Sequence, residues 1–291
     1  MTPKILEGKT LAEKIRQDAK VKIEELKAKH GKIPFLFAVD PAFDESSTIY
    51  LKREISACHK LGIKTELKKI SPKISKSDFI NLLKTCSSDK NIDAILIPRP
   101  LPEHLNDISI WQHLNPNKDI DGTSVINAGK LFLCKSFDEI EKNDFFVPCT
   151  ALAVIKLMRY HNITVSGKSV AVLGRSSTVG KPLAHMLSAL NATVTLCHSK
   201  TEKLAEILQN SDILLSAVGK PKFIDENLVK SDAIIIDIGT NTDEKGNFCG
   251  DVDFESVIKK ASAITPVPGG VGPVTLSCLL KHIAKSAFKS V

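Results

Sequence analysis

The chain has 291 residues, of which 43% are hydrophobic and 25% are charged, and this ordinary globular composition excludes a disordered or fibrous protein. The length suggests one large domain or two moderate ones. No apolar run approaches the roughly 20 residues that span a bilayer, and the N-terminal segment lacks the uncharged apolar core of a signal peptide. We therefore expect a cytoplasmic protein with no membrane partner.

The formal net charge of +7 leaves nucleic acid, an anionic small ligand or no specific partner open. Lysines alternate with glutamates, as in residues 20–32, which is typical of solvated helix faces, and no nucleic-acid-binding module is recognisable. We therefore predict no nucleic-acid partner. The seven cysteines are scattered and contain no CxxC pair, so neither a disulfide framework nor a metal site is predicted.

The first third of the chain alternates between helix-like and strand-like patterns. Apolar residues recur at helical spacing over residues 9–30, and the apolar run at residues 35–39 is typical of a buried strand. Ser77 or Asp78 is the expected N-cap of a later helix. The full pattern of helix, strand, helix, strand, helix, strand covers residues 9–30, 35–39, 48–63, 65–70, 75–88 and 94–98. It predicts parallel strands joined by helices.

Residues 99–150 are rich in turn-forming residues and are expected to be irregular. Long loops in a compact domain are usually functional. A helix at about residues 150–162 leads into a second α/β series, with expected strands at 169–174, 193–197, 213–219 and 233–239 and helices at 180–190, 202–209 and 253–260. The predicted fold class is therefore α/β.

A glycine-rich turn follows the first strand of the second series. Gly174 ends the strand and Gly180 opens the next helix, although Ser176 breaks the common GxGxxG pattern. The first glycine permits a sharp turn and the second permits close packing of helix on sheet. Backbone N–H groups and the helix dipole can then hold a phosphate. Pro182 fits the first helical turn, where its missing N–H costs nothing.

The next strand ends about 20 residues further on, at the position where NAD-selective sites carry an acidic residue for the ribose hydroxyls. This chain has His198, Ser199 and Lys200 there instead. Together with Arg175, these side chains suit a 2′-phosphate and therefore NADP. A structural strand-to-helix turn with basic residues at its surface is the alternative that these residues alone leave open.

Several segments together resemble the methylenetetrahydrofolate dehydrogenase/cyclohydrolase family. They are GKTLAEKIR (8–16), DIDG (119–122), PCT (148–150), GRSSTVGKP (174–182), CHSKT (197–201), GDVDF (250–254) and ITPVPGGVGPVT (264–275). The segments occur in the family's order and at its spacing over nearly the whole chain. PVPGGVGP, close to the C-terminus, is highly specific.

The resemblance implies two domains. Residues 1–147 and a returning helix at 274–291 would form a folate-binding α/β domain, and residues 148–273 would form a Rossmann domain for NADP, with folate in the cleft between them. The resemblance also implies hydride transfer from 5,10-methylenetetrahydrofolate to NADP and hydrolysis of the resulting methenyl cation to 10-formyltetrahydrofolate. Family members commonly form homodimers through the Rossmann domain.

The resemblance also implies two sets of site residues. The folate would contact Tyr50, Pro98, Asp121, Pro268, Gly269 and Gly270, with Asp121 anchoring the pterin amino group and ring nitrogen. The NADP would contact Gly174, Arg175, Ser176, Val179, Gly180, Pro182, His198, Ser199 and Thr240. Either a structural role or a cofactor contact is expected for His198.

The chain departs from the family pattern at two positions. The family has a lysine four residues after the tyrosine and a glutamine that hydrogen-bonds it, where this chain has Glu54 and Pro98. Helix positions i and i+4 lie about 40° apart, so Glu54 shares a face with Tyr50, whereas Lys52 lies about 160° away. Arg53 is nearer, but its guanidinium stays protonated and cannot exchange protons.

Three functions stay open at this point. The first is an NADP-dependent dehydrogenase with a weak or lost hydrolytic step, since hydride transfer depends mostly on orienting two bound molecules. The second is a fully bifunctional enzyme in which Glu54 or a displaced Lys52 exchanges the proton. The third is a non-catalytic paralogue, against which the intact Tyr50 and Asp121 argue. The catalytic candidates are Tyr50, Lys52, Glu54 and Asp121.

Overall fold

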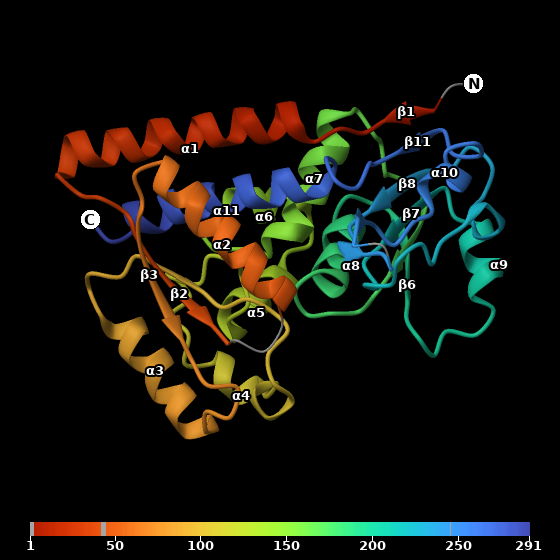
Figure 1. Ribbon diagram of the computed structural model, residues 1–291. Helices are drawn as coiled ribbons and strands as arrows, with labels where there is room; N and C mark the ends of the chain where they lie inside the picture. Colours follow the sequence, from red (N-terminus) through yellow and green to blue (C-terminus); the bar gives the residue numbers. More distant parts are fainter. Residues whose placement is uncertain (1–2, 42–44, 245) are drawn as a thin grey trace. The chain divides into compact units, whose positions relative to one another are not determined.

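The computed structural model describes residues 3–41, 45–244 and 246–291. The chain folds into two compact units, each built around one sheet (Figure 1). The six-stranded unit comprises Met1–Glu13, Phe132–Asn143 and Pro148–Thr275, and the three-stranded unit comprises Lys14–Leu131, Asp144–Val147 and Leu276–Val291. No helix in the described ranges is long and apolar enough to cross a membrane.

The six-stranded unit contains an all-parallel sheet of order β1-β11-β8-β7-β5-β6. Its strands are β1 (Lys4–Ile5), β5 (Ser169–Leu173), β6 (Thr193–Cys197), β7 (Ile213–Ser216), β8 (Ile234–Asp237) and β11 (Ala263–Ile264). After β1 the chain re-enters the sheet at β5, moves outward to β6 and then returns past β5 to β7. This reversal of strand order makes the carboxyl end of β5 a topological switch point, where ligands of α/β sheets bind.

Short helices and a hairpin complete this unit. They are α6 (Phe137–Lys142), α7 (Cys149–Tyr160), α8 (Gly180–Ser188), α9 (Leu204–Gln209), α10 (Phe254–Val257), the 3-10 helix Glu226–Leu228 and the antiparallel pair β9 (Asn241–Thr242) and β10 (Phe248–Cys249). Buried residues of the strands pack with Leu208 of α9 and Val257 of α10 in one apolar cluster. Burial on both faces explains why β5, β7 and β8 are continuous apolar runs in the sequence.

The N-terminal segment contributes a strand to this same sheet. Backbone N–H groups of Lys4 and Leu6 donate to Ser262 and Ile264, and β1 pairs in parallel with β11. The family resemblance implied that residues 1–147 belong to the other domain, whereas this segment pairs with the six-stranded sheet. A two-residue strand is too short to show the alternation by which a strand is identified in a sequence.

The three-stranded unit has a parallel sheet of order β3-β2-β4, formed by β2 (Phe35–Asp40), β3 (Lys64–Lys69) and β4 (Ala94–Leu96). Its helices are α1 (Lys9–His30), α2 (Glu45–Lys60), α3 (Lys76–Ser88), the 3-10 helix Glu103–Leu105, α4 (Ile108–Trp111), α5 (Val125–Leu133) and α11 (Val271–Phe288), of which α1 and α11 begin in residues assigned to the six-stranded unit. Every residue of central strand β2 is buried. Phe35, Phe37 and Val39 share one face of the sheet and pack against α3 and α4.

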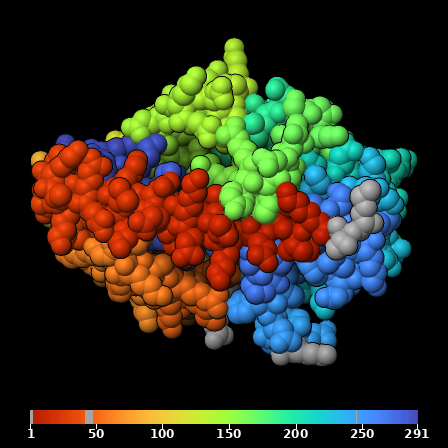
Figure 2. All heavy atoms as spheres, turned by 90° about the horizontal axis from the view of Figure 1, so that it is seen from above, coloured from red at the N-terminus to blue at the C-terminus, as the bar shows by residue number. Residues whose placement is uncertain are grey.

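Helix α1 shows the solvated charge pattern that its sequence predicts. Its polar residues are mostly exposed, while Leu11, Ile15 and Leu26 are buried, and the helix lies at the surface in Figure 2, where it is drawn in red. Lys20 and Glu24 face each other at 3.8 Å on this outer surface. Such exposed pairs stabilise a helix by only about 0.3–0.5 kcal/mol, so the buried stripe holds α1 in place.

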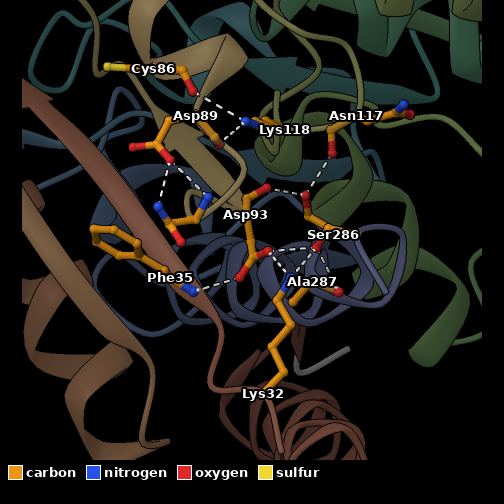
Figure 3. A network of polar contacts seen from close by, with 11 residues as sticks. Lys32, Phe35, Cys86, Asp89, Asp93, Asn117, Lys118, Ser286 and Ala287 are labelled. Carbon is orange, nitrogen blue, oxygen red and sulfur yellow. Dashed lines mark hydrogen bonds and ion pairs between the residues drawn. The ribbon is translucent and has the colours of Figure 1, made fainter. Parts of the chain in front are cut away.

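A polar network fastens helix α11 to the three-stranded sheet (Figure 3). The buried carboxylate of Asp93 accepts from the Phe35 backbone at 3.0 Å and from Ser290 Oγ at 2.6 Å, and it pairs with Lys32 Nζ at 2.7 Å. Ser286 Oγ lies 2.5 Å from the Asp93 carbonyl. Each polar atom of this buried carboxylate therefore has a partner, as burial of a charge requires.

Two expectations about local structure were wrong. The N-cap of α3 is Ser75, whose Oγ accepts from the Asp78 backbone at 3.0 Å, and not Ser77 or Asp78. Asp78 in turn accepts from Ser75 Oγ at 2.7 Å, which holds the capping hydroxyl in place. The supposedly irregular residues 99–150 contain α4, α5 and α6. In α5 the exposed Phe132 and Leu133 obscure the helical period.

Candidate functional site

The glycine-rich turn of the six-stranded unit is shaped by close backbone contacts. Gly174 has φ +106°, and a Cβ there would lie 2.4 Å from the Ala217 carbonyl oxygen. A Cβ on Gly180 would lie 1.8 Å from the Gly174 carbonyl oxygen. Both positions therefore require glycine. The turn lies at the carboxyl end of β5, where the strand order reverses.

Ser176 organises the inside of this turn. Its Oγ accepts from the backbone N–H groups of Val179 at 3.1 Å and Gly180 at 3.4 Å, and its carbonyl accepts from Lys181 at 3.0 Å. Two of the amides expected to hold a phosphate thus have a partner within the loop. Pro182 is buried in the first turn of α8, as its fixed φ permits.

Arg175 and Ser199 lie at one edge of the sheet. Leu173 of β5 pairs with Cys197 of β6, and Arg175 and Ser199 each follow two residues after their member of that pair. Both side chains are exposed. A hydroxyl and a guanidinium at this edge provide the donors that a ribose 2′-phosphate needs, and no carboxylate replaces them.

His198 stabilises the turn after β6. Its backbone N–H donates to Thr201 Oγ1 at 2.8 Å, and its Nδ1 accepts from the Lys200 backbone at 3.2 Å. An accepting Nδ1 places the proton of the neutral ring on Nε2. The imidazole thus has a structural role in the turn, consistent with the first of the two roles expected for it.

Two aspartates, Asp237 and Asp251, support the strand end beside Thr240, and the sequence reasoning assigned neither a role. Asp237 accepts from the backbones of Gly239, Asp251 and Val252 at 2.9 to 3.0 Å. Asp251 accepts from Ser216, Val218, Lys220 and Asn241. Burial raises the pKa of Asp237 to about 7, opposed by its backbone hydrogen bonds. The pair fixes the backbone that presents the exposed Thr240.

The segment PVPGG also depends on a close approach of backbones. Gly8 donates to the Gly269 carbonyl at 2.8 Å, and a Cβ on Gly8 would lie 2.0 Å from the Gly270 carbonyl oxygen. Gly270 donates to the Pro266 carbonyl at 2.8 Å. Pro268 is exposed at the tip of this loop. The loop is therefore held to the N-terminal segment, and Gly8 is a supporting residue that the sequence reasoning missed.

In the three-stranded unit, Tyr50 and Glu54 lie four residues apart on α2 and are both half-buried. Burial, and then the negative charge of Asp121, raises the pKa of Glu54 to about 8. Cys58, one turn further on, is buried, and burial followed by the charge of Glu54 raises its pKa to about 12. Lys52 is exposed and is not brought to this face.

Asp121 lies in a loop that Asp119 organises. The buried Asp119 carboxylate accepts from the backbones of Thr123 at 2.9 Å and Ser124 at 2.7 Å. Gly122 has φ +60°, and a Cβ there would lie 2.7 Å from Val147 Cα. These contacts fix the backbone on both sides of Asp121. Its own side chain is half-buried, near enough to Glu54 to raise that residue's pKa.

Arg99 is a further charged residue of this unit on which Asp121 acts, and the sequence reasoning assigned it no role. It follows Pro98 after β4, and its Cζ lies 3.9 Å from the centroid of the buried Trp111 ring. Its Nη1 donates to Asn106 Oδ1 at 2.9 Å. Burial lowers the pKa of Arg99 to about 10, opposed by the charge of Asp121. The available signal was an arginine beside one of the two positions that depart from the family pattern.

Comparisons with known proteins match both parts of the chain to the two domains of one enzyme family. Residues 6–121 match the family model described as tetrahydrofolate dehydrogenase/cyclohydrolase, catalytic domain, and residues 148–291 match the model of the corresponding NAD(P)-binding domain. A protein of Elusimicrobium minutum named bifunctional protein FolD is 53% identical over 287 residues, covering 99% of this chain and 100% of the relative.

Solved structures show the same similarity. The bifunctional FolD enzyme of Campylobacter jejuni superposes with a TM-score of 0.89 at 36% identity and 99% coverage of both chains. The Trypanosoma brucei methylenetetrahydrofolate dehydrogenase-cyclohydrolase, complexed with NADP cofactor and inhibitor, has a TM-score of 0.89 at 30% identity, covering 99% of this chain and 98% of that one.

Proposed function

Because the chain belongs to the tetrahydrofolate dehydrogenase/cyclohydrolase family, we propose that it oxidises 5,10-methylenetetrahydrofolate with NADP and hydrolyses the methenyl product, using Glu54 to exchange the proton. Full-length similarity to relatives named bifunctional supports both activities and weighs against the expectation of a lost hydrolytic step. The observation that carries the assignment to residue 54 is a half-buried carboxyl beside Asp121 with a pKa of about 8.

The residues of the six-stranded unit fit NADP. Added side chains at Gly174 and Gly180 would collide with backbone, so both glycines keep the turn as tight as a dinucleotide-binding turn requires. Arg175 and Ser199 lie at the neighbouring strand ends and would hold the 2′-phosphate. Thr240 lies after β8 and would line the nicotinamide pocket. When bound, NADP supplies the chemistry of hydride acceptance.

The residues of the three-stranded unit fit the folate. Tyr50 offers an aromatic face on the same side of α2 as Glu54, and Asp121 offers a carboxylate that can accept from a pterin amino group and a ring N–H. Removing hydride leaves the one-carbon unit as a cation, which nearby carboxylates stabilise. This accounts for an acidic residue, Glu54, at the position where the family has a lysine.

Hydrolysis then requires a group that can both take and release a proton. A methenyl cation beside Glu54 favours its carboxylate form, so the residue ionises when the cation binds. The carboxylate accepts a proton from water as the water oxygen bonds to the methenyl carbon. Glu54 then returns this proton to the ring nitrogen as the carbon–nitrogen bond breaks. One proton from the water leaves to solvent, and the product is the formyl derivative.

A glutamine at position 98 is not needed in this arrangement. In the family that amide orients a lysine, whereas Glu54 is half-buried and experiences the charge of Asp121. Pro98 can neither donate a backbone hydrogen bond nor offer a side-chain amide. With the lysine gone, a glutamine at position 98 has no side chain to orient, and Pro98 can stand in its place.

The test is an absorbance assay that follows the formation and the decay of methenyltetrahydrofolate separately. We expect wild-type decay to exceed the buffer rate, and Glu54→Gln to lower it by about a hundredfold, in the range of general acid–base catalysis, while dehydrogenase turnover falls less. The exposed Glu24→Gln on α1 is the matched control and should retain both rates. If methenyltetrahydrofolate decayed at the buffer rate with the wild type, the protein would be a dehydrogenase without cyclohydrolase activity. Loss of decay in Lys52→Gln but not in Glu54→Gln would transfer the role to Lys52.

Three coarser proposals accompany this one. Tetrahydrofolate derivatives are the substrates, and we infer a homodimer assembled through the six-stranded unit, whose edge strand β6 leaves one row of backbone groups unpaired within the sheet. Light scattering at micromolar concentration tests this, and a monomer mass would contradict it. We also propose that the protein is cytoplasmic, which fits seven scattered cysteines without a CxxC pair.

A further inference from the structure

Helix α11 holds the segment that leads into Asp121. His282 and Ser286 lie four residues apart in this helix, which places both side chains on one of its faces. Ser286 Oγ lies 2.6 Å from the Asn117 carbonyl oxygen (Figure 3), and His282 Nδ1 lies 2.8 Å from the Ile120 carbonyl oxygen. The segment is therefore held to α11 at two points, and the second point is the residue just before Asp121.

The hydrogen bond between His282 and Ile120 acts directly on the backbone at Asp121. His282 is buried, with 8% of its surface exposed. Because a carbonyl oxygen only accepts, Nδ1 carries the proton and donates it to Ile120. This carbonyl belongs to the peptide group that joins Ile120 to Asp121. That group is planar, so a donor that fixes its oxygen also fixes the plane containing the nitrogen and Cα of Asp121.

The imidazole ring also contacts the segment that confines the other side of Asp121. Its centroid lies 5.2 Å from that of the buried Phe146 ring, in an edge-to-face arrangement. The backbone of Phe146 in turn lies against Gly122, where an added Cβ would be 2.8 Å from the Phe146 carbonyl oxygen. His282 thus contacts both the peptide group before Asp121 and the residue that limits the position after it.

We propose that His282 is a positioning residue for folate binding, which sets the backbone at Asp121 through its hydrogen bond to Ile120. A carboxylate that accepts two hydrogen bonds from the edge of a planar ring must be held within about 0.5 Å of the productive geometry. The N–H group of His282 supplies this constraint without contact to the pterin. The inference rests on the proposed role of Asp121 as the acceptor for the pterin.

Two substitutions separate the hydrogen bond from the packing of the ring. His282→Phe keeps a ring against Phe146 and removes the donor, whereas His282→Asn removes the ring and keeps an N–H group near the position of Nδ1. We expect His282→Phe to raise the Kd for tetrahydrofolate about tenfold, as loss of a hydrogen bond to a buried acceptor allows. His282→Asn should stay within about twofold of the wild type. Calorimetric titration measures both, and NADP affinity should not change in either variant.

Ser286→Ala is the matched control, because Ser286 lies on the same face of α11 and contacts the same segment further from Asp121. It should lower the melting temperature, as His282→Phe does, and leave tetrahydrofolate affinity within about twofold of the wild type. Equal losses of affinity in Ser286→Ala and His282→Phe would indicate general loosening of α11 and overturn the proposal. A larger loss in His282→Asn than in His282→Phe would also overturn it, since packing and not the donor would then matter.

A double variant shows whether His282 acts through Asp121. If it does, adding His282→Phe to Asp121→Asn should lower tetrahydrofolate affinity by less than about a further twofold, because residues that act as a unit are not additive. A further tenfold loss overturns the inference and leaves the role of Asp121 intact. Normal affinity in Asp121→Asn alone would contradict the proposed pterin site itself, and the inference with it.

Discussion

The turn at Gly174 and the cluster at Asp121 are built by different means. In the six-stranded unit, carbonyl oxygens of Gly174 and Ala217 come so close that two positions must be glycine. In the three-stranded unit, the site consists of side chains whose charges act on one another, and the charge of Asp121 acts on both Arg99 and Glu54. The turn at Gly174 therefore tolerates no added side-chain atom at its two glycines. The cluster at Asp121 tolerates exchange of residues if the charges stay balanced.

A substitution in the glycine-rich turn at 174–180 gives the largest expected loss of ligand binding. Gly180→Ala places a methyl group 1.8 Å from the Gly174 carbonyl oxygen, and overpacking against backbone costs about 3 kcal/mol. We expect NADP binding to fall more than about a hundredfold, measured by calorimetry alongside thermal unfolding. Gly129→Ala in α5 is the control, because a Cβ there meets nothing within 4 Å. It should leave NADP binding unchanged and stabilise the helix by about 1 kcal/mol.

Asp121→Asn tests the site of charged side chains in the three-stranded unit. Asparagine has nearly the same shape but offers an N–H group to a pterin edge that also donates. Hydrogen bonds to a charged group contribute about 1.5–3 kcal/mol each, so we expect tetrahydrofolate affinity to fall about a hundredfold while NADP affinity stays unchanged. Titration with each ligand separately measures the two affinities. Unchanged folate affinity would mean that the pterin binds elsewhere.

Arg175→Ala gives a smaller effect, because it removes one contact and not the shape of the turn. Loss of a charge-assisted hydrogen bond of about 1.5–3 kcal/mol lowers NADP affinity about ten- to a hundredfold. NAD affinity should not change. Lys168→Ala is the matched control, since Lys168 is an exposed cation just before the opposite end of β5. Equal losses of NADP affinity in both variants would indicate general electrostatic attraction and not a 2′-phosphate site.

The same contrast explains what could be predicted from the sequence. Glycine spacing and strand ends predicted the turn at 174–180 and the edge that carries Arg175 and Ser199, because backbone sterics act within a few residues. Strand β1 was missed because two residues show no period. Arg99 was missed because its stacking on Trp111 and the charge of Asp121 that acts on it come from other parts of the sequence and are brought together only by the fold.

Lost hydrolysis was the first expectation from Glu54 and Pro98, and it depended on comparing side-chain types alone. A glutamate normally ionises near pH 4, too low for proton exchange at neutral pH. Burial and the charge of Asp121 bring the pKa of Glu54 to about 8. The substitution of lysine by glutamate therefore retains a titrating group, and only the surroundings of position 54 reveal this.

The smallest effect concerns stability and pH, and it isolates Glu54 from catalysis. Its pKa is raised from 4.5 in the unfolded chain to about 8 in the folded one, so the folded state binds more protons over that window. Stability is therefore full below about pH 4.5 and is lost as pH rises through about 8. After allowance for partial solvent access, Glu54→Gln should raise the unfolding free energy by about 2 kcal/mol at pH 8.5 and by much less at pH 5. Urea unfolding at both pH values measures this.

Glu24→Gln, on the solvated face of α1, should change stability by less than about 0.5 kcal/mol at either pH. Asp237, with a pKa of about 7, adds a decline of the same sign that both variants share, so the difference between the variants belongs to Glu54. If Glu54→Gln gained no stability at high pH, the carboxyl of Glu54 would have an ordinary pKa in the folded protein. It would then be ionised at neutral pH and could not carry the proton assigned to it.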